Sequence, residues 1–266
     1  MFAPRLSFAI VLALSASACT HSPTQRWNDL LSFQPPQTPQ HRPAQNLGAE
    51  ITHLWRDATD VVNASIPASA GIRISLKTDT RLVPTAGTPD AVEVQGEFAL
   101  VATREHTEVY PPGRYLLNSP AARTFALAVT DLISQTHQRL HRQHQVLVTV
   151  DYFGGADGLK VNKLRYSGEF GPLAIDPAQL LINGVQPSAP LRLNAGDAIS
   201  NEQLAVLRAI AMQHLFEESP RLTQPNLLVS SRLFANTHED IGAELRYAKV
   251  SIKIQRRPLN LRQREL

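Results

Sequence analysis

The stretch from residue 244 to residue 254 alternates between apolar and polar side chains, and this alternation constrains the fold more than any other feature. Tyr247, Lys249, Ser251 and Lys253 fall on one face of an extended chain, and the residues between them are aliphatic. Because successive side chains of a strand point to opposite sides, the pattern predicts a sheet with one apolar and one polar face. We expect helices to cover the apolar face.

Helical and extended patterns follow one another along the rest of the chain. Apolar residues at helical spacing predict helices over 49–63, from Ser119-Pro120 to about 142, and from the Ser200–Gln203 capping box to 217. The predicted strands cover residues 72–83, 92–101, 146–150, 161–166, 180–182, 191–193, 226–234 and 244–254. The order β-α-β-(insert)-α-β-β predicts an α+β sandwich with its helices packed on one face of a mixed sheet.

Residues 1–18 have the pattern of a secretory signal peptide. One positive charge, Arg5, precedes an apolar run of about nine residues, which is far shorter than the roughly 20 residues of a membrane-spanning helix. The small residues Ala16-Ser17-Ala18 would suit ordinary signal peptidase, and followed by Cys19 they also resemble a bacterial lipobox. The two modes of cleavage remain open from the sequence.

Cys19 is the only cysteine of the 266 residues and falls at the cleavage point. A free thiol there would be exposed to an oxidising compartment, so we expect Cys19 to be acylated, with palmitate among its lipid chains. Thr20 follows where enteric inner-membrane lipoproteins have Asp, which favours the periplasmic face of the outer membrane.

The composition changes after Cys19 and again near residue 48. Residues 19–48 are rich in Pro, Gln and His and predict an extended tether without a core. Residues 49–94 form an N-terminal extension of open role, and we expect the main domain at 95–257 with an insertion at about 155–200. Residues 258–266 form a basic tail.

Three short motifs lie within residues 95–257. Asn201 to Ala209 reads N-E-Q-L-A-V-L-R-A, which fits N-x-x-L-S-x-x-R-A apart from Ala205. Thr149 to Gly154 keeps D-x-x-G, and residues 247–252 keep the hydrophobic pattern of N-R-R-V-E-I without its Asn and Arg. These motifs resemble the OmpA C-terminal-like domain, the peptidoglycan-binding module of OmpA, MotB and the peptidoglycan-associated lipoprotein.

The resemblance implies a peptidoglycan site that contains Asp151, Gly154, Asn201 and Arg208. Its ligand would be the zwitterionic diaminopimelate of the stem peptide, with Arg208 on the carboxylate and Asp151 on the ammonium group. Asp151 and Arg208 lie 57 positions apart, because the insertion separates them. Three other interpretations stay open: Asp157 replaces Asp151 in a shifted register, Asp151 and Arg208 form a structural salt bridge, or Asp151 only stabilises a turn at Gly154.

The sequence contains none of the common catalytic or nucleotide-binding motifs, so we expect neither an enzyme nor a bound cofactor. His137, His141 and His144 share a helical face, but no carboxylate completes a metal site there, and a solvated helix end is expected. A net charge of +3 without a long basic tract argues against nucleic acid as a partner.

Two functions follow as expectations. The first is an outer-membrane lipoprotein that binds peptidoglycan non-covalently and links the membrane to the cell wall. The second is a structural subunit of an envelope-spanning machine, for secretion or conjugation, that binds other envelope proteins and has lost the peptidoglycan site.

Overall fold

The computed structural model describes residues 44–82, 92–103, 108–117, 119–140, 144–161, 163–217 and 227–258. The expected signal peptide, Cys19, the tether up to residue 43 and the tail beyond Pro258 lie outside these residues. Within them, no helix is long and apolar enough to cross a membrane.

The fold is α+β with a mixed sheet, as the sequence predicts, and within the described residues it contains one six-stranded sheet and three α-helices. The strands in spatial order are β1 (Ile72–Leu82), β2 (Val92–Ala102), β8 (Ala248–Pro258), β3 (His144–Ala156), β7 (Leu227–Thr237) and β5 (Leu180–Ile182). Neighbours are antiparallel from β1 to β3, whereas β3, β7 and β5 are parallel. A separate two-stranded sheet pairs β4 (Leu173–Ile175) with β6 (Leu191–Leu193).

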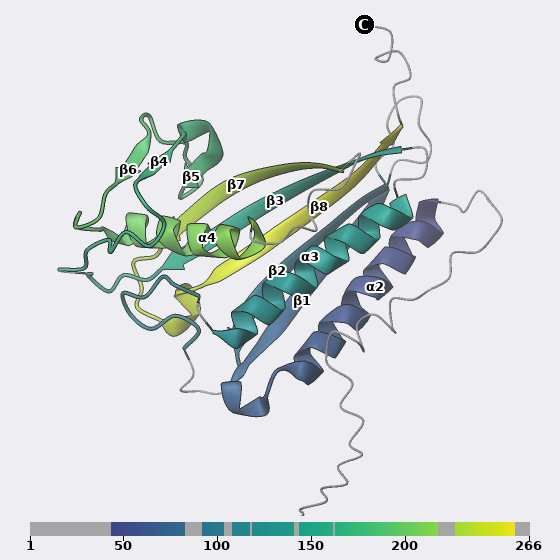
Figure 1. The fold of residues 1–266 in the computed structure, drawn as a ribbon, viewed down its shortest axis with the longest axis horizontal. Helices are drawn as coiled ribbons and strands as arrows, with labels where there is room; N and C mark the ends of the chain where they lie inside the picture. The colour runs from purple at the N-terminus through teal and green to yellow at the C-terminus, as the bar shows by residue number, and fades with distance from the viewer. Residues whose placement is uncertain are drawn as a thin grey trace, which may run out of the picture. The chain divides into compact units, whose positions relative to one another are not determined.

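The helices α2 (Ala44–Ser65), α3 (Pro120–Leu140) and α4 (Asn201–Glu217) lie side by side on one face of the six-stranded sheet (Figure 1). The predicted caps are present: Ser119 Oγ accepts from the Ala122 amide at 3.1 Å, and Ser200 Oγ accepts from the Gln203 amide at 3.2 Å. Each cap satisfies an amide that the first helical turn leaves unbonded.

Residues 49–94, whose role the sequence leaves open, belong to the same sheet and helix layer. They supply most of α2, all of β1 and the first part of β2, so the expected boundary between residues 94 and 95 falls inside a strand. Trp55 of α2 is fully buried, and its indole nitrogen donates to Thr136 Oγ1 of α3 at 2.9 Å. The helix also begins at Ala44, within the range expected for the tether.

The structure corrects the predicted end of one strand. The sequence predicts a strand over 146–150 that ends at Asp151–Gly154, but β3 continues to Ala156 and stays paired with β7 to that residue and with β8 to Gly154. The glycine of D-x-x-G therefore lies within the strand, and Asp151 is in the middle of it. The strand predicted over 161–166 is reduced to one bridge between Arg165 and Ala198.

Gly154 determines how closely α4 packs on β3. A Cβ atom at Gly154 would lie 1.9 Å from the carbonyl oxygen of Ala205 and 2.8 Å from the amide nitrogen of Ala209, both on α4. These are backbone atoms of a helix, so they cannot relieve the clash by a change of rotamer, as a flexible side chain could. The helix therefore rests on the strand at this distance only because residue 154 has no side chain.

We predict that Gly154→Ala lowers the free energy of unfolding by about 3 kcal/mol, because α4 has to move away from β3. Gly184→Ala is the matched control: its added Cβ meets no atom within 4 Å, and it should cost only about 1 kcal/mol for the positive φ of 79°. Urea denaturation of both variants measures the difference. Equal losses would contradict the close packing of α4 on β3.

Candidate functional site

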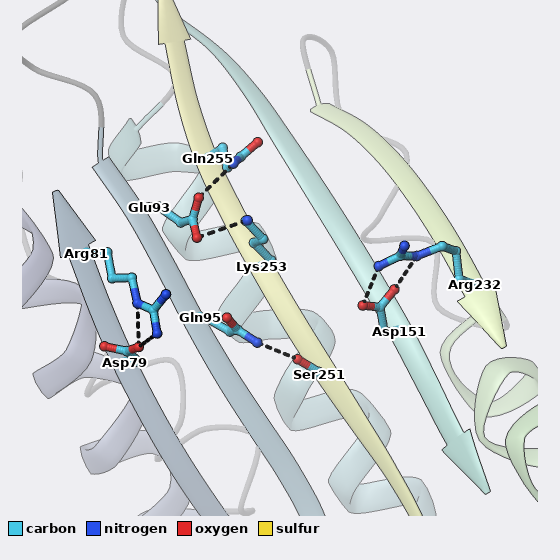
Figure 2. Close-up of polar contacts among 9 residues, drawn as sticks. All are labelled: Asp79, Arg81, Glu93, Gln95, Asp151, Arg232, Ser251, Lys253 and Gln255. Carbon is cyan, nitrogen blue, oxygen red and sulfur yellow. Dashed lines mark hydrogen bonds and ion pairs between the residues drawn. The ribbon is translucent and has the colours of Figure 1, made fainter. Parts of the chain in front are cut away.

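Asp151 lies on the face of the sheet opposite the helices. Its neighbours in the strand, Val150 and Tyr152, are buried on the helix side, so the Asp151 carboxylate points away from α4. It accepts two hydrogen bonds of 2.9 Å from Arg232 of β7, one from Nε and one from Nη2 (Figure 2). These bonds raise the pKa of Arg232 and occupy both carboxylate oxygens.

The same face carries further polar pairs between neighbouring strands. Glu93 of β2 accepts from Lys253 at 3.0 Å and from Gln255 at 2.7 Å, and Gln95 donates to Ser251 at 3.3 Å (Figure 2). We call this side of the sheet the polar face. It consists of the outward residues of β1, β2, β8, β3 and β7, and its charges are largely paired with one another.

Arg208 lies on the other side of the sheet and is fully buried. Its Nε donates to the carbonyl oxygen of Arg114 at 2.9 Å, and its Nη1 donates to the carbonyl oxygen of Gly155. The guanidinium carbon lies 5.0 Å from the ring centre of Tyr110. Burial lowers the pKa of Arg208 to about 10, so the guanidinium remains charged at neutral pH.

The structure therefore does not bring Asp151 and Arg208 together, either as a ligand site or as a salt bridge. Asp151 faces away from the helices, whereas Arg208 approaches β3 from the helix layer. The expectation fails because the D-x-x-G segment is strand and not turn, which places Asp151 on the polar face. Gly154 serves the packing of α4, as described above.

The carboxylate near Arg208 is that of Asp157, the residue given by the shifted register. Asp157 follows directly after β3, is buried, and its negative charge partly offsets the lowering of the Arg208 pKa. Asn201 Nδ2 at the start of α4 donates to the Asp157 carbonyl oxygen at 2.9 Å. Two of the predicted site residues, Asn201 and Arg208, thus lie around Asp157.

Arg246, which is buried, and Glu108, which is exposed, complete this group. Arg246 Nε lies 3.7 Å from an oxygen of Asp157, and its Nη2 donates to Glu108 Oε1 at 2.7 Å. Together with Arg208 the group contains two guanidinium groups and two carboxylates, so its formal charges cancel. We call the three buried members, Asp157, Arg208 and Arg246, the buried charge cluster.

Residues 108–117, which we call the covering segment, enclose the cluster. Tyr110 is 1% exposed over Arg208, and Arg114 supplies the accepting carbonyl. Tyr115 holds the segment to the insertion, since its hydroxyl bonds to Glu169 Oε2 at 2.6 Å and to Ser167 Oγ at 2.9 Å. Residues of the insertion therefore fasten the segment that closes the site.

Several buried polar atoms near Arg208 have no hydrogen-bond partner among the described residues. They are Tyr110 Oη, Asp157 Oδ2, Asn201 Oδ1, Arg208 Nη2 and Arg246 Nε. Burial raises the pKa of Tyr110 well above its usual value, so its hydroxyl stays protonated. The arrangement can hold charge in a polar interior, and its only exposed charged member among the described residues is Glu108, whereas both guanidinium groups and Asp157 are buried.

An open groove of about 430 Å³ lies beside the first turn of α4. Its lining residues are Lys160, Val161, Ile199, Ser200, Asn201, Glu202, Thr237 and His238. Asn201 belongs to this lining, but Arg208 and Asp157 do not. Of the four predicted site residues, only Asn201 lines this groove.

Among the residues that the structure describes, no group of three metal-ligating side chains occurs. His137 is buried, which corrects the expected solvated helix end at this position. The His141 position and the His144 side chain lie outside the description.

No protein-family model matches the chain, and no curated protein matches it. The resemblance to the OmpA C-terminal-like domain therefore remains an inference from its motifs.

The geometry predicts different roles for Arg208 and Asp151 in stability. Arg208→Ala should lower the free energy of unfolding by about 3 kcal/mol or more, because the buried Gly155 carbonyl and the partly buried Arg114 carbonyl lose their donor and a cavity remains. Asp151→Ala should cost at most about 1 kcal/mol, because it removes one partly exposed ion pair. Guanidinium chloride denaturation of both variants measures this, and a loss for Asp151→Ala as large as for Arg208→Ala would disagree with the assignment.

Proposed function

We propose that this protein is a lipid-anchored structural component of the bacterial outer membrane whose periplasmic domain binds other envelope proteins. The N-terminal pattern with Cys19 supports the anchor and the compartment, as argued from the sequence. The folded domain supplies the binding surface. In this proposal the site that resembles a peptidoglycan site has become part of the protein interior.

The burial of Arg208 carries the proposal. A diaminopimelate carboxylate would need its guanidinium, but two carbonyl groups of the chain and the Tyr110 ring already occupy it. Replacing these contacts by a ligand means displacing the covering segment and exposing Tyr110, which is almost fully buried. Binding would have to supply the free energy of that opening.

The polar face supports protein binding. Among the described residues no helix covers it, and cross-strand pairs hold many of its charged side chains in place (Figure 2). Phe153 and Phe234 stack at 4.6 Å, with Arg232 over Phe234 at 5.2 Å and Lys249 over Phe153 at 5.1 Å. A surface with side chains already ordered loses less conformational entropy when a partner binds.

Peptidoglycan binding is the second candidate, and the position of Asp157 favours it. Asp157, Asn201 and Arg208 meet where β3 ends and α4 begins, and Asn201 reaches the open groove beside α4. If the covering segment opened, Arg208 and Asp157 would offer the two charges that a zwitterion needs. The two candidates therefore differ in whether Arg208 becomes accessible.

Co-sedimentation with purified peptidoglycan sacculi separates the two candidates. We predict that the full-length protein in detergent stays in the supernatant, because the buried charge cluster is closed. Pelleting that is lost in Asp157→Asn but kept in Asp151→Asn would support the second candidate and contradict the first. Asp151→Asn is the matched control, since Asp151 lies on the polar face.

Photo-crosslinking in cells tests protein binding directly. A photoreactive amino acid at Lys77 or Gln95, both exposed on the polar face, should give an adduct with a distinct envelope protein. The same amino acid at Leu127, which is 53% exposed on α3, should not give that adduct. Equal adducts from all three positions, or none from the polar face, would count against the proposed function.

A further inference from the structure

The two edges of the six-stranded sheet differ in how they are protected. At the β1 edge, the Asn63 side chain of α2 bonds both backbone groups of Ile74, donating to its oxygen at 2.9 Å and accepting from its nitrogen at 2.7 Å. Exposed charged residues then follow along the strand, among them Lys77 and Asp79. Charged side chains and capped backbone groups are the usual means of preventing a further strand from pairing with an edge.

The β7 edge lacks this protection along its first half. The short strand β5 pairs only with residues 233–235 of β7. Residues 227–232 have no strand partner on that side among the described residues. The backbone donors and acceptors on that side of β7 are therefore open to a further strand.

The side chains of residues 227–231 within this open half are neutral. Leu228 is 49% exposed and Val229 is 41% exposed, and two serines follow them. The first charge along the strand is Arg232, and Asp151 of the neighbouring strand already binds it. In a sheet whose outer face is otherwise rich in charge, a neutral and partly apolar edge indicates a surface that is covered by another strand.

We propose that this edge, residues 227–231 of β7, pairs with the same edge of a second copy of this chain. An antiparallel pairing about a two-fold axis near Val229 continues the sheet from one copy into the other. The axis stands perpendicular to the sheet, so the helix layers of both copies remain on the same side. Each copy contributes the same backbone groups and the same neutral side chains.

The pattern of side chains favours a second copy over an unrelated strand. In the antiparallel arrangement about Val229, Val229 faces its own equivalent, Leu228 faces Ser230, and no two like charges oppose each other within residues 227–231. The run contains no charge or aromatic ring that would select a different sequence. Because β5 occupies the edge from residue 233 onward, the pairing is limited to about five residues per copy.

A pairing of this length buries a small area, so we expect a weak and reversible dimer. Sedimentation velocity of the full-length chain in detergent should show dimer formation between about 1 and 100 µM. Val229→Lys should weaken the dimer by about tenfold or more, because it places two ammonium groups next to each other at the axis. Ile241→Lys, at a residue that is 68% exposed away from this edge, should leave the dimer unchanged.

A monomer throughout this concentration range would overturn the proposal. So would an equal effect of Val229→Lys and Ile241→Lys, because the dimer would then not depend on the β7 edge. Circular dichroism of each variant establishes that it is folded before the association is compared.

Cysteine crosslinking locates the interface independently. In a Cys19→Ala background, which removes the only native cysteine, Val229→Cys should form a disulfide-linked dimer under mild oxidation. Lys77→Cys on the β1 edge is the matched control and should stay monomeric. Equal dimer yields at the two edges, or a disulfide from Val229→Cys to a different protein, would overturn pairing with a second copy.

Discussion

The missing side chain at Gly154 is the constraint on which the rest of the structure depends. It lets the backbone of α4 lie against β3, where any Cβ would collide with the Ala205 carbonyl. At this distance Arg208, one turn further along α4 from Ala205, reaches the carbonyl oxygen of Gly155. The close contact between helix and strand thus places a guanidinium group inside the protein.

A buried guanidinium is costly unless its charge and its donors find partners. Around Arg208, β3 and the covering segment supply carbonyl groups for Nη1 and Nε, Asp157 supplies a negative charge, and Tyr110 supplies a ring face, whereas Nη2 has no hydrogen-bond partner among the described residues. The insertion contributes as well, because its residues Ser167 and Glu169 form hydrogen bonds with the Tyr115 hydroxyl of the covering segment. Elements far apart in the sequence therefore close one polar interior, while no helix of the described residues covers the opposite face of the sheet.

Local patterns predicted much of the fold. The capping residues Ser119 and Ser200 marked the starts of two helices, and the alternation in the last strand assigned Lys249 to the polar face. These features depend on neighbours in the sequence, so periodicity and capping chemistry reveal them. The α+β class followed from the order of such elements.

The candidate site was less predictable, because it depends on contacts between distant residues. A D-x-x-G segment suits a turn as well as a strand, and only the packing of α4 on Gly154 decides between them. Tyr110 and Glu108 belong to a segment without periodicity, so nothing in the sequence linked them to Arg208. Arg232 was missed too, although its place on the polar face of a predicted strand next to Asp151 could have suggested the pair.

Chemical labelling of arginine tests most directly the claim that the Arg208 site is closed. Phenylglyoxal modifies accessible guanidinium groups, and mass spectrometry identifies each modified position. The account predicts that Arg192, which is exposed, reacts in the native protein, whereas Arg208 reacts only after unfolding in urea. The lowered pKa of Arg208 would favour its reaction with any phenylglyoxal that reached it. An unmodified Arg208 in the native protein would therefore mean that the reagent has no access to it. Native modification of Arg208 at the rate of Arg192 would contradict the closed site.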